Sequence, residues 1–197
     1  MSRVRMIVTQ RREIIEVAIL RQEYEAIQQI TNEMFGDFYD SKRIEISDDG
    51  RVISLNLSNL ELKVLDQSIG ELNSLSDLAV DYNNCLTSLP DTIGNLCLLE
   101  KFSVDYGYLT SLPDTIGNLG SLKLFTVCKN QLTSLPKSIG NLSSLQILDV
   151  NYNCLTSLPE SIGNLSSLQD FYAVGNQFDE NSRKLLVELG RNTNVVF

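Results

Sequence analysis

Few residue types in this chain can perform catalytic chemistry. The 197 residues include no histidine, so neither a Ser–His nor a Cys–His nucleophile pair can form. The cysteines are Cys85, Cys97, Cys128 and Cys154. They are scattered without a CxxC pair, and we expect reduced thiols rather than disulfides or metal ligands. No glycine-rich phosphate-binding motif is present. The sequence therefore predicts a protein that is not an enzyme and has no metal or other cofactor.

Binding chemistry is better represented, because a polar residue directly followed by tyrosine recurs along the chain. The pairs are Asp81–Tyr82, Asp105–Tyr106 and Asn151–Tyr152. A tyrosine offers a large rigid surface with a polar tip, and a neighbouring carboxylate attracts Arg or Lys. Such pairs suit the anchors of a protein interface. For the tyrosines, a structural role in a turn is an equal alternative, whereas we favour binding for Asp81 and Asp105.

These residues are positioned by an internal repeat. The block Leu-Thr-Ser-Leu-Pro begins at Leu86, Leu109, Leu132 and Leu155, in steps of 23 residues. Between the blocks, apolar residues alternate in segments such as Leu122-x-x-Phe125-x-Val127, which is typical of a short strand with one buried face. The proline of each block ends the extended segment and presets the first position of a short helix, and the segments "DTIGNL", "KSIGNL" and "ESIGNL" supply one or two helical turns. Periods of this size indicate stacked supersecondary units.

An asparagine follows most of these strands, and its amide can pair with backbone groups that a tight turn would leave buried. This structural row consists of Asn83, Asn130, Asn153 and Asn176. Gly107 stands where the row requires another asparagine. If the turn at Gly107 is regular, Gly107→Asn should stabilise the stack.

The pattern L-x-x-L-x-L-x-x-N-x-L resembles the leucine-rich repeat, over about residues 52–178. The 23-residue LPxxIGNL form is similar to the Ras-suppressor and plant intracellular Ras-group type. The resemblance implies an α/β solenoid: six strands form a curved parallel sheet, with short helices on the convex side. It also implies intracellular protein binding, in which small GTPases and signalling scaffolds are partners.

The ends of the chain predict caps for the terminal repeats. Residues 1–51 are expected to form a helical cap, from Thr9 to Phe35, followed by a β-hairpin around the Asp-Gly turn at 49–50. A partner-binding helix is the alternative to a cap. Residues 179–197 are expected to form a C-terminal helical cap with Asn181 or Ser182 as N-cap and Gly190 as its end. The whole chain would then be one structural domain.

In the predicted sheet, alternate residues of each strand point outward on the concave face, the surface that such solenoids use for binding. The candidate partner-binding residues are Asp77, Asp81, Tyr82, Lys101, Asp105, Tyr106, Leu124, Lys129, Ile147, Asp149, Tyr152 and Tyr172. They mix aromatic, apolar and acidic side chains, as an interface anchor does.

Charge limits the class of partner. The chain has 25 acidic and 16 basic residues, a net charge of −9, which disfavours nucleic acid and favours a protein with a basic surface. No membrane span or secretory signal is recognised, so we expect a cytoplasmic monomer. The predicted function is a non-catalytic protein-interaction module. A regulator of a small GTPase or signalling enzyme, and a secreted host-directed effector, are the alternatives.

Overall fold

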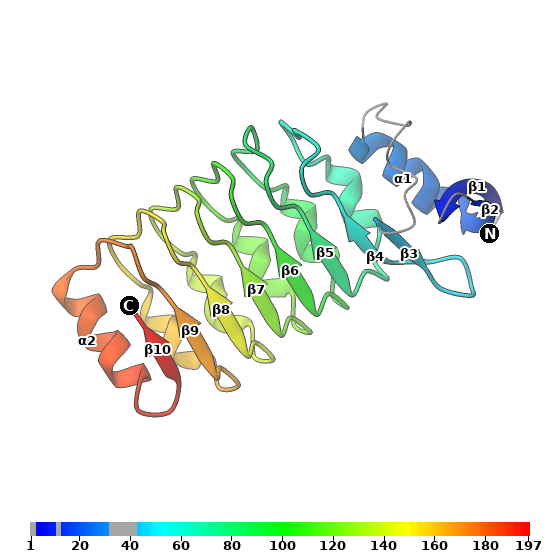
Figure 1. The fold of residues 1–197 in the computed structure, drawn as a ribbon. Coiled ribbons are helices and arrows are strands. Elements are labelled where there is room, and N and C mark those ends of the chain that lie inside the picture. The colour runs from blue at the N-terminus through cyan, green and yellow to red at the C-terminus, as the bar shows by residue number, and fades with distance from the viewer. Residues whose placement is uncertain (1–2, 11–12, 32–42) are drawn as a thin grey trace.

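The computed structural model describes residues 3–10, 13–31 and 43–197. Its main feature is a sheet of eight strands in the order β10-β9-β8-β7-β6-β5-β4-β3 (Figure 1). The strands are β3 (Ile44–Ile46), β4 (Val52–Asn56), β5 (Asp77–Ala79), β6 (Lys101–Ser103), β7 (Leu124–Thr126), β8 (Ile147–Asp149), β9 (Asp170–Tyr172) and β10 (Asn194–Val196). Strands β4 to β10 pair in parallel, and β3 pairs antiparallel with β4. The predicted stack of six parallel repeat strands and the predicted hairpin are both confirmed.

The register of the sheet brings equivalent residues of successive repeats side by side. Phe102 pairs with Phe125, which pairs with Leu148. All three side chains are fully buried, and the two phenylalanine rings stack with centroids 5.4 Å apart. Each middle residue of a strand thus faces the core, while its two neighbours are left on the outward face of the sheet. The period-two alternation in the sequence predicts this arrangement.

Within the described residues, five 3-10 helices lie behind the sheet (Figure 1). They are η1 (Gln67–Glu71), η2 (Asp91–Asn95), η3 (Asp114–Asn118), η4 (Lys137–Asn141) and η5 (Glu160–Asn164). In η2 to η5 a proline with φ near its ring-imposed value is the N-cap, so the helix begins one residue later than expected. The isoleucine of each helix is fully buried.

The asparagine row holds the turns after the strands together. The Asn153 Oδ1 accepts a hydrogen bond from the Leu132 amide at 3.0 Å, and its Nδ2 donates to the Val127 and Val150 carbonyls at 2.9 and 3.1 Å. Asn83, Asn130 and Asn176 make equivalent contacts. One amide therefore satisfies backbone groups from two repeats, which is the structural role that the sequence predicts.

The turn at Gly107 keeps the backbone hydrogen bonds of the other turns, from the Tyr106 amide to the Cys128 carbonyl and from the Tyr108 amide to the Leu86 carbonyl, and the irregularity lies in the repeat before it. The preceding unit is one residue longer, with a step of 24 from Leu62 to Leu86, and the Leu86 amide donates to the Asn83 carbonyl at 3.0 Å. The Asn83 carbonyl thereby replaces the acceptor that an asparagine at 107 would provide. A Cβ on Gly107 would lie 2.8 Å from the Asn130 Oδ1. The turn is regular, as the condition for stabilisation by Gly107→Asn requires, but this close approach to a bonded oxygen opposes the expected gain.

The N-terminal segment differs from the predicted long helix. It forms an antiparallel hairpin of β1 (Arg3–Gln10) and β2 (Glu13–Leu20), followed by a shorter helix α1 (Arg21–Thr31). The run Glu13–Leu20 is rich in β-branched residues, which favour a strand once a partner strand is available. The end of the predicted helix, from Asn32 to Phe35, lies outside the described residues.

Helix α1 covers the first repeat, as the cap interpretation expects. Its residues Ala26, Ile27 and Ile30 are buried in the continuous core of the repeats. The buried Glu23 carboxylate accepts a hydrogen bond from the Val52 amide and pairs with Arg51 at 3.3 Å. Burial raises the pKa of Glu23, while these two contacts oppose the rise. Helix α1 is thus tied to the start of the sheet by both apolar and polar contacts.

The C-terminal cap is helix α2 (Glu180–Leu189), which leads to β10. Its N-cap is Asp179 rather than the expected Asn181 or Ser182, because the Asp179 carboxylate accepts a hydrogen bond from the Ser182 amide at 2.7 Å. Leu186 is fully buried. Gly190 ends the helix, as predicted. The helix of the cap therefore begins earlier than the sequence suggests.

Candidate protein-binding face

The candidate residues from the strands lie in two lateral rows on the outward side of the sheet, here called the sheet face. One row contains Asp77, Lys101, Leu124 and Ile147, and successive members pair in register. The other row contains Asp149 and Tyr172, which also pair in register. The Lys101 Nζ lies 3.0 Å from the Asp77 Oδ1, and this contact raises the pKa of Lys101. Leu124 and Ile147 are only half-buried. The sheet face thus presents an exposed ion pair beside apolar side chains.

A hollow of about 310 Å³ opens on the sheet face over β4 to β7. Small outward residues leave this space: Ser54, Ala79 and Ser103 occupy three neighbouring strands. Lys101 and Leu124 stand at its side. Its volume lies at the low end of the range for ligand pockets, about 300–1,000 Å³. The hollow can accept a side chain of a partner protein.

A second feature is the tyrosine row, which occupies the position just before the asparagine row or, in one repeat, before Gly107. It consists of Tyr82, Tyr106, Lys129 and Tyr152. All four have a left-handed backbone, with φ between 53° and 57°. Asn59 and Gly175 occupy the same position in the first and last repeats and are also left-handed. A residue with a Cβ loses about 1–2 kcal/mol in this conformation, and Gly or Asn is the usual choice. Large side chains are therefore kept here against the backbone preference.

The tyrosine row is exposed and its side chains contact one another. The rings of Tyr82 and Tyr106 stack with centroids 4.4 Å apart and an interplanar angle of 16°. The Lys129 ammonium lies 4.4 Å from the centroid of Tyr106 and 5.8 Å from that of Tyr152, and donates to the Tyr106 hydroxyl at 3.0 Å. Tyr82 and Tyr152 are 49% and 55% exposed. The row forms a ridge with its aromatic surface open to solvent.

The aspartates beside these tyrosines are engaged inside the protein. The Asp81 carboxylate accepts from the Asp105 amide at 2.8 Å and from the Ser103 hydroxyl at 2.9 Å. Asp105 in turn accepts from the Cys128 amide at 2.7 Å. Each carboxylate thus fastens the turn of the next repeat, a structural role that the sequence did not reveal.

The same environment changes the acidity of Asp105. Burial of the carboxyl group raises the pKa of Asp105 to about 6, and the nearby charges of Asp81 and Asp149 act in the same direction. Burial also raises the pKa of Asp149, whose carboxylate accepts from the Asn151 amide at 2.8 Å. In the next repeat, the position of Asp81 and Asp105 is occupied by Cys128, which has no carboxylate. The Asn151 amide therefore donates to Asp149 of its own repeat.

The structure therefore separates the candidate residues into two groups. The tyrosine row and the strand residues Asp77, Lys101, Leu124 and Ile147 present surface to solvent, whereas Asp81 and Asp105 hold the stack together. Tyr172 is half-buried beside Asp149, its register neighbour in β8. That any of them contacts a partner stays a prediction.

Two features of this surface are absent from the sequence-based site. The hollow over β4 to β7 depends on small residues in adjacent repeats, a signal visible only when outward positions are compared across repeats. Tyr108, just after Gly107, is a further exposed aromatic residue, with 47% of its surface open to solvent.

Metal-binding clusters and membrane-spanning helices are both absent from the part of the chain that the structure describes. Among these residues, no group of three or more Cys, Asp or Glu side chains could hold a metal ion. Within the same ranges, no helix has the length and apolar character needed to cross a membrane.

Comparisons with known proteins agree with this architecture. Residues 103–195 match the family described as a leucine-rich repeat region. The solved structure of a Leptospira interrogans leucine-rich repeat protein is similar, with a TM-score of 0.70 and 31% identity over 74% of this chain. This chain spans only 37% of the length of that protein. No curated protein sequence matches the chain.

Two structures from Arabidopsis thaliana show the same fold at lower identity. The ectodomain of the receptor kinase SOBIR1 has a TM-score of 0.67 and 23% identity, over 81% of this chain and 95% of that chain. The BIR3–SERK2 complex matches with a TM-score of 0.58 and 22% identity, over 76% of this chain and 84% of that chain. Together with the repeats and the parallel sheet, these matches identify the fold of this chain as a leucine-rich repeat solenoid.

Proposed function

We propose that the chain is a non-catalytic protein-interaction module that binds a partner across the sheet face and the tyrosine row. The observation that carries the proposal is the tyrosine row itself. Three tyrosines occupy left-handed positions at which Gly or Asn would relieve strain, and their rings remain exposed. Strain that is kept at a surface site supports a role in binding.

The hollow and the tyrosine row complement each other as an interface. A side chain of the partner would enter the hollow beside Lys101 and Leu124, while the rings of Tyr82 and Tyr106 would bury flat aromatic surface. Aromatic anchors around a pocket are the usual source of affinity in protein complexes. The net charge of −9 supports a partner with a basic surface.

The fold supports a protein partner more strongly than any other class. A protein complex occurs among the similar structures, that of BIR3 with SERK2. We further propose a cytoplasmic location, because Cys85, Cys97 and Cys154 are free and exposed, which suits a reducing compartment. Regulation of a small GTPase, suggested by the LPxxIGNL repeat type, and a host-directed effector role would use the same sheet face.

The test is affinity capture from the lysate of the source organism with the full chain and a double variant, Ala79→Arg with Tyr106→Asn. The arginine side chain introduced at position 79 would fill the hollow, and Asn suits the left-handed position without providing a ring. A matched control, Thr133→Arg, adds the same charge at an exposed site outside the sheet face. We expect a specific partner that wild type and control retain and the double variant loses. Equal capture by all three chains would contradict the proposal.

The alternatives are separated with the captured partner. Binding that differs between GDP-loaded and GTP-loaded forms of a captured GTPase would indicate regulation. A partner found only in a host proteome would indicate an effector.

A further inference from the structure

The glycine of each "IGN" segment marks a close contact between successive 3-10 helices. A Cβ built on this glycine would lie 2.3–2.6 Å from the carbonyl oxygen of a Thr or Ser in the next helix. The contacting pairs are Gly70–Thr92, Gly94–Thr115, Gly117–Ser138 and Gly140–Ser161. The absence of a side chain at this glycine therefore lets the next helix pack closely against it. The residue that packs there is Thr or Ser in all four pairs.

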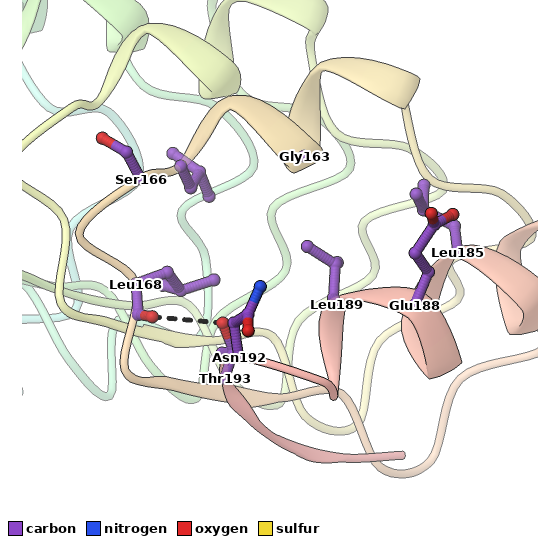
Figure 2. A pocket seen from close by; sticks show the side chains of 9 residues that line it. Gly163, Ser166, Leu168, Leu185, Glu188, Leu189, Asn192 and Thr193 are labelled. Carbon is purple, nitrogen blue, oxygen red and sulfur yellow. Dashed lines mark hydrogen bonds between the residues drawn. The ribbon is translucent and has the colours of Figure 1, made fainter.

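Gly163, the glycine of the last 3-10 helix, has no further repeat packed against it. A Cβ on Gly163 would meet no atom within 4 Å. Helix α2 follows instead of a further 3-10 helix, and a cavity of about 400 Å³ lies between η5 and α2. Figure 2 shows Gly163 on one side of this cavity and Leu185 and Leu189 of α2 on the other.

The walls of the cavity resemble the inner surface of the repeat stack. Leu165 and Leu168 line it and each keep 6% of their surface exposed, whereas the equivalent Leu142 and Leu145 are fully buried. The wall is held in place at its base, where the Thr193 hydroxyl donates to the Leu168 carbonyl at 3.1 Å (Figure 2). The cavity is thus an uncovered continuation of the surface on which each repeat packs.

We propose that this groove binds a helical turn of a partner protein, with a serine or threonine seated on Gly163 and an aliphatic residue against the four leucines. The stack itself shows the contacts that such a turn would make. In two of the four pairs the hydroxyl also forms a hydrogen bond, from Thr92 to the Gln67 carbonyl and from Ser161 to the Lys137 carbonyl, both at 2.7 Å. In the other two pairs the Thr115 and Ser138 hydroxyls are buried without a hydrogen-bond partner, so the close backbone contact is the feature that all four share. In η5 the Glu160 carbonyl occupies the equivalent position.

The charge around the groove favours a bound segment that carries a basic residue. The exposed Glu188 of α2 stands at the groove, and the chain carries a net charge of −9. A basic residue in front of the serine would meet an attractive field. The segment Lys137-Ser138-Ile139-Gly140 of this chain has that order, so a synthetic peptide of residues 135–142, LPKSIGNL, is a suitable probe.

The experiment is a titration of the isotope-labelled full chain with this peptide, followed by amide chemical shifts. We expect the amides of Gly163, Leu165 and Leu189 to shift, with a Kd of about 1 mM or tighter. A peptide with leucine in place of its serine should bind about tenfold more weakly, because leucine cannot sit against a glycine backbone. The variant Gly163→Leu should lose binding by a similar factor.

Gly120→Leu is the matched control, because a Cβ on Gly120 also meets open space and the substitution adds the same side chain elsewhere. It should bind the peptide as wild type does. Absence of shifts at the groove, equal binding by Gly163→Leu, or equal binding of the leucine peptide would each overturn the proposal. Self-association of the chain that Gly163→Leu abolishes would replace the partner protein with a second copy and overturn the assigned occupant.

Discussion

The asparagine row and the tyrosine row stand next to each other in the turns but have opposite environments. Asn153 is 5% exposed, whereas Tyr152, one residue earlier, is 55% exposed. The asparagine bonds to backbone groups of its own repeat and of the previous one. The tyrosine packs on its neighbours in the row and faces the solvent. Equal periodicity in a sequence therefore does not imply an equal role.

The difference follows from the direction of the backbone at each position. The left-handed residue turns the chain at the end of each strand, and its side chain points away from the core. The next residue then faces the inside of the turn, where several amides and carbonyls lack partners from the sheet. An amide side chain satisfies them, while the tyrosine position is free to vary, as Asn59, Lys129 and Gly175 show.

Asn153→Ala, in the asparagine row, should cause a larger loss of stability than the other substitutions below. It leaves the buried Leu132 amide and the Val127 and Val150 carbonyls without their side-chain partner. We expect the free energy of unfolding to fall by about 3–5 kcal/mol, measured by urea denaturation. A loss below about 1 kcal/mol would contradict the structural role of the row.

Gly107→Asn tests the gap in the asparagine row. The new Cβ would lie 2.8 Å from the Asn130 Oδ1, which accepts from the Leu109 amide at 3.0 Å, so this buried bond must shift. We expect a melting temperature below that of wild type and a loss of about 1–3 kcal/mol. Gly120→Asn, in open space, is the control and should change stability by about 0.5 kcal/mol or less. A higher melting temperature for Gly107→Asn would show that the Asn130 side chain can move aside and that the new asparagine completes the row.

Asp105→Asn tests the carboxylate between the two rows. The folded chain raises the pKa of Asp105 to about 6, so it holds the proton more tightly than the unfolded chain does. That stabilisation is complete at low pH and is lost as the pH rises through about 6. The neutral Asn keeps an acceptor for the Cys128 amide.

We therefore expect the Asn variant to be more stable than wild type at pH 7.5 by about 1–2 kcal/mol, after a discount for solvent screening. The gain should vanish near pH 4, and urea denaturation at both pH values measures it. A variant less stable than wild type at pH 7.5 would show that the charged form of Asp105 is required.

Tyr152→Gly should have the smallest effect on folding. Glycine adopts the left-handed conformation freely, which offsets the lost packing of the ring against Gly175. We expect the free energy of unfolding to change by about 1 kcal/mol or less, in the same denaturation assay as Asn153→Ala. A large loss would assign the tyrosine row to stability and remove the main support for its role in binding.

Much of the fold was predictable because it depends on local, repeated signals. The alternation around Phe102 and Phe125 indicates the strands, and the buried asparagines follow from the polar demands of a tight turn. The N-terminal hairpin was not predictable in this way. The run Glu13–Leu20 has no period of its own that excludes a helix, and only pairing with Arg3–Gln10 makes it a strand.

The candidate site was predictable in its residues but not in their roles. Asp81 and Tyr82 are adjacent in the same turn, yet the carboxylate of Asp81 binds the next turn while the ring of Tyr82 stacks on Tyr106. The hollow on the sheet face and the groove at Gly163 depend on residues that are absent or small in neighbouring repeats. The division of the chain at residues 51/52 and 178/179 stays a prediction.

The repeat, the parallel stack and the asparagine row can all be predicted from the order of the amino acids, because each repeat must bury the same apolar and polar groups in the same way. Which side chains of a turn stay exposed and which bind the next repeat became clear only in three dimensions. That choice depends on backbone direction and on contacts between residues about 23 positions apart in sequence, as between Asp105 and Cys128. The open position of Gly163 has the same origin, because the element that follows η5 and β9 is a helix rather than a further repeat.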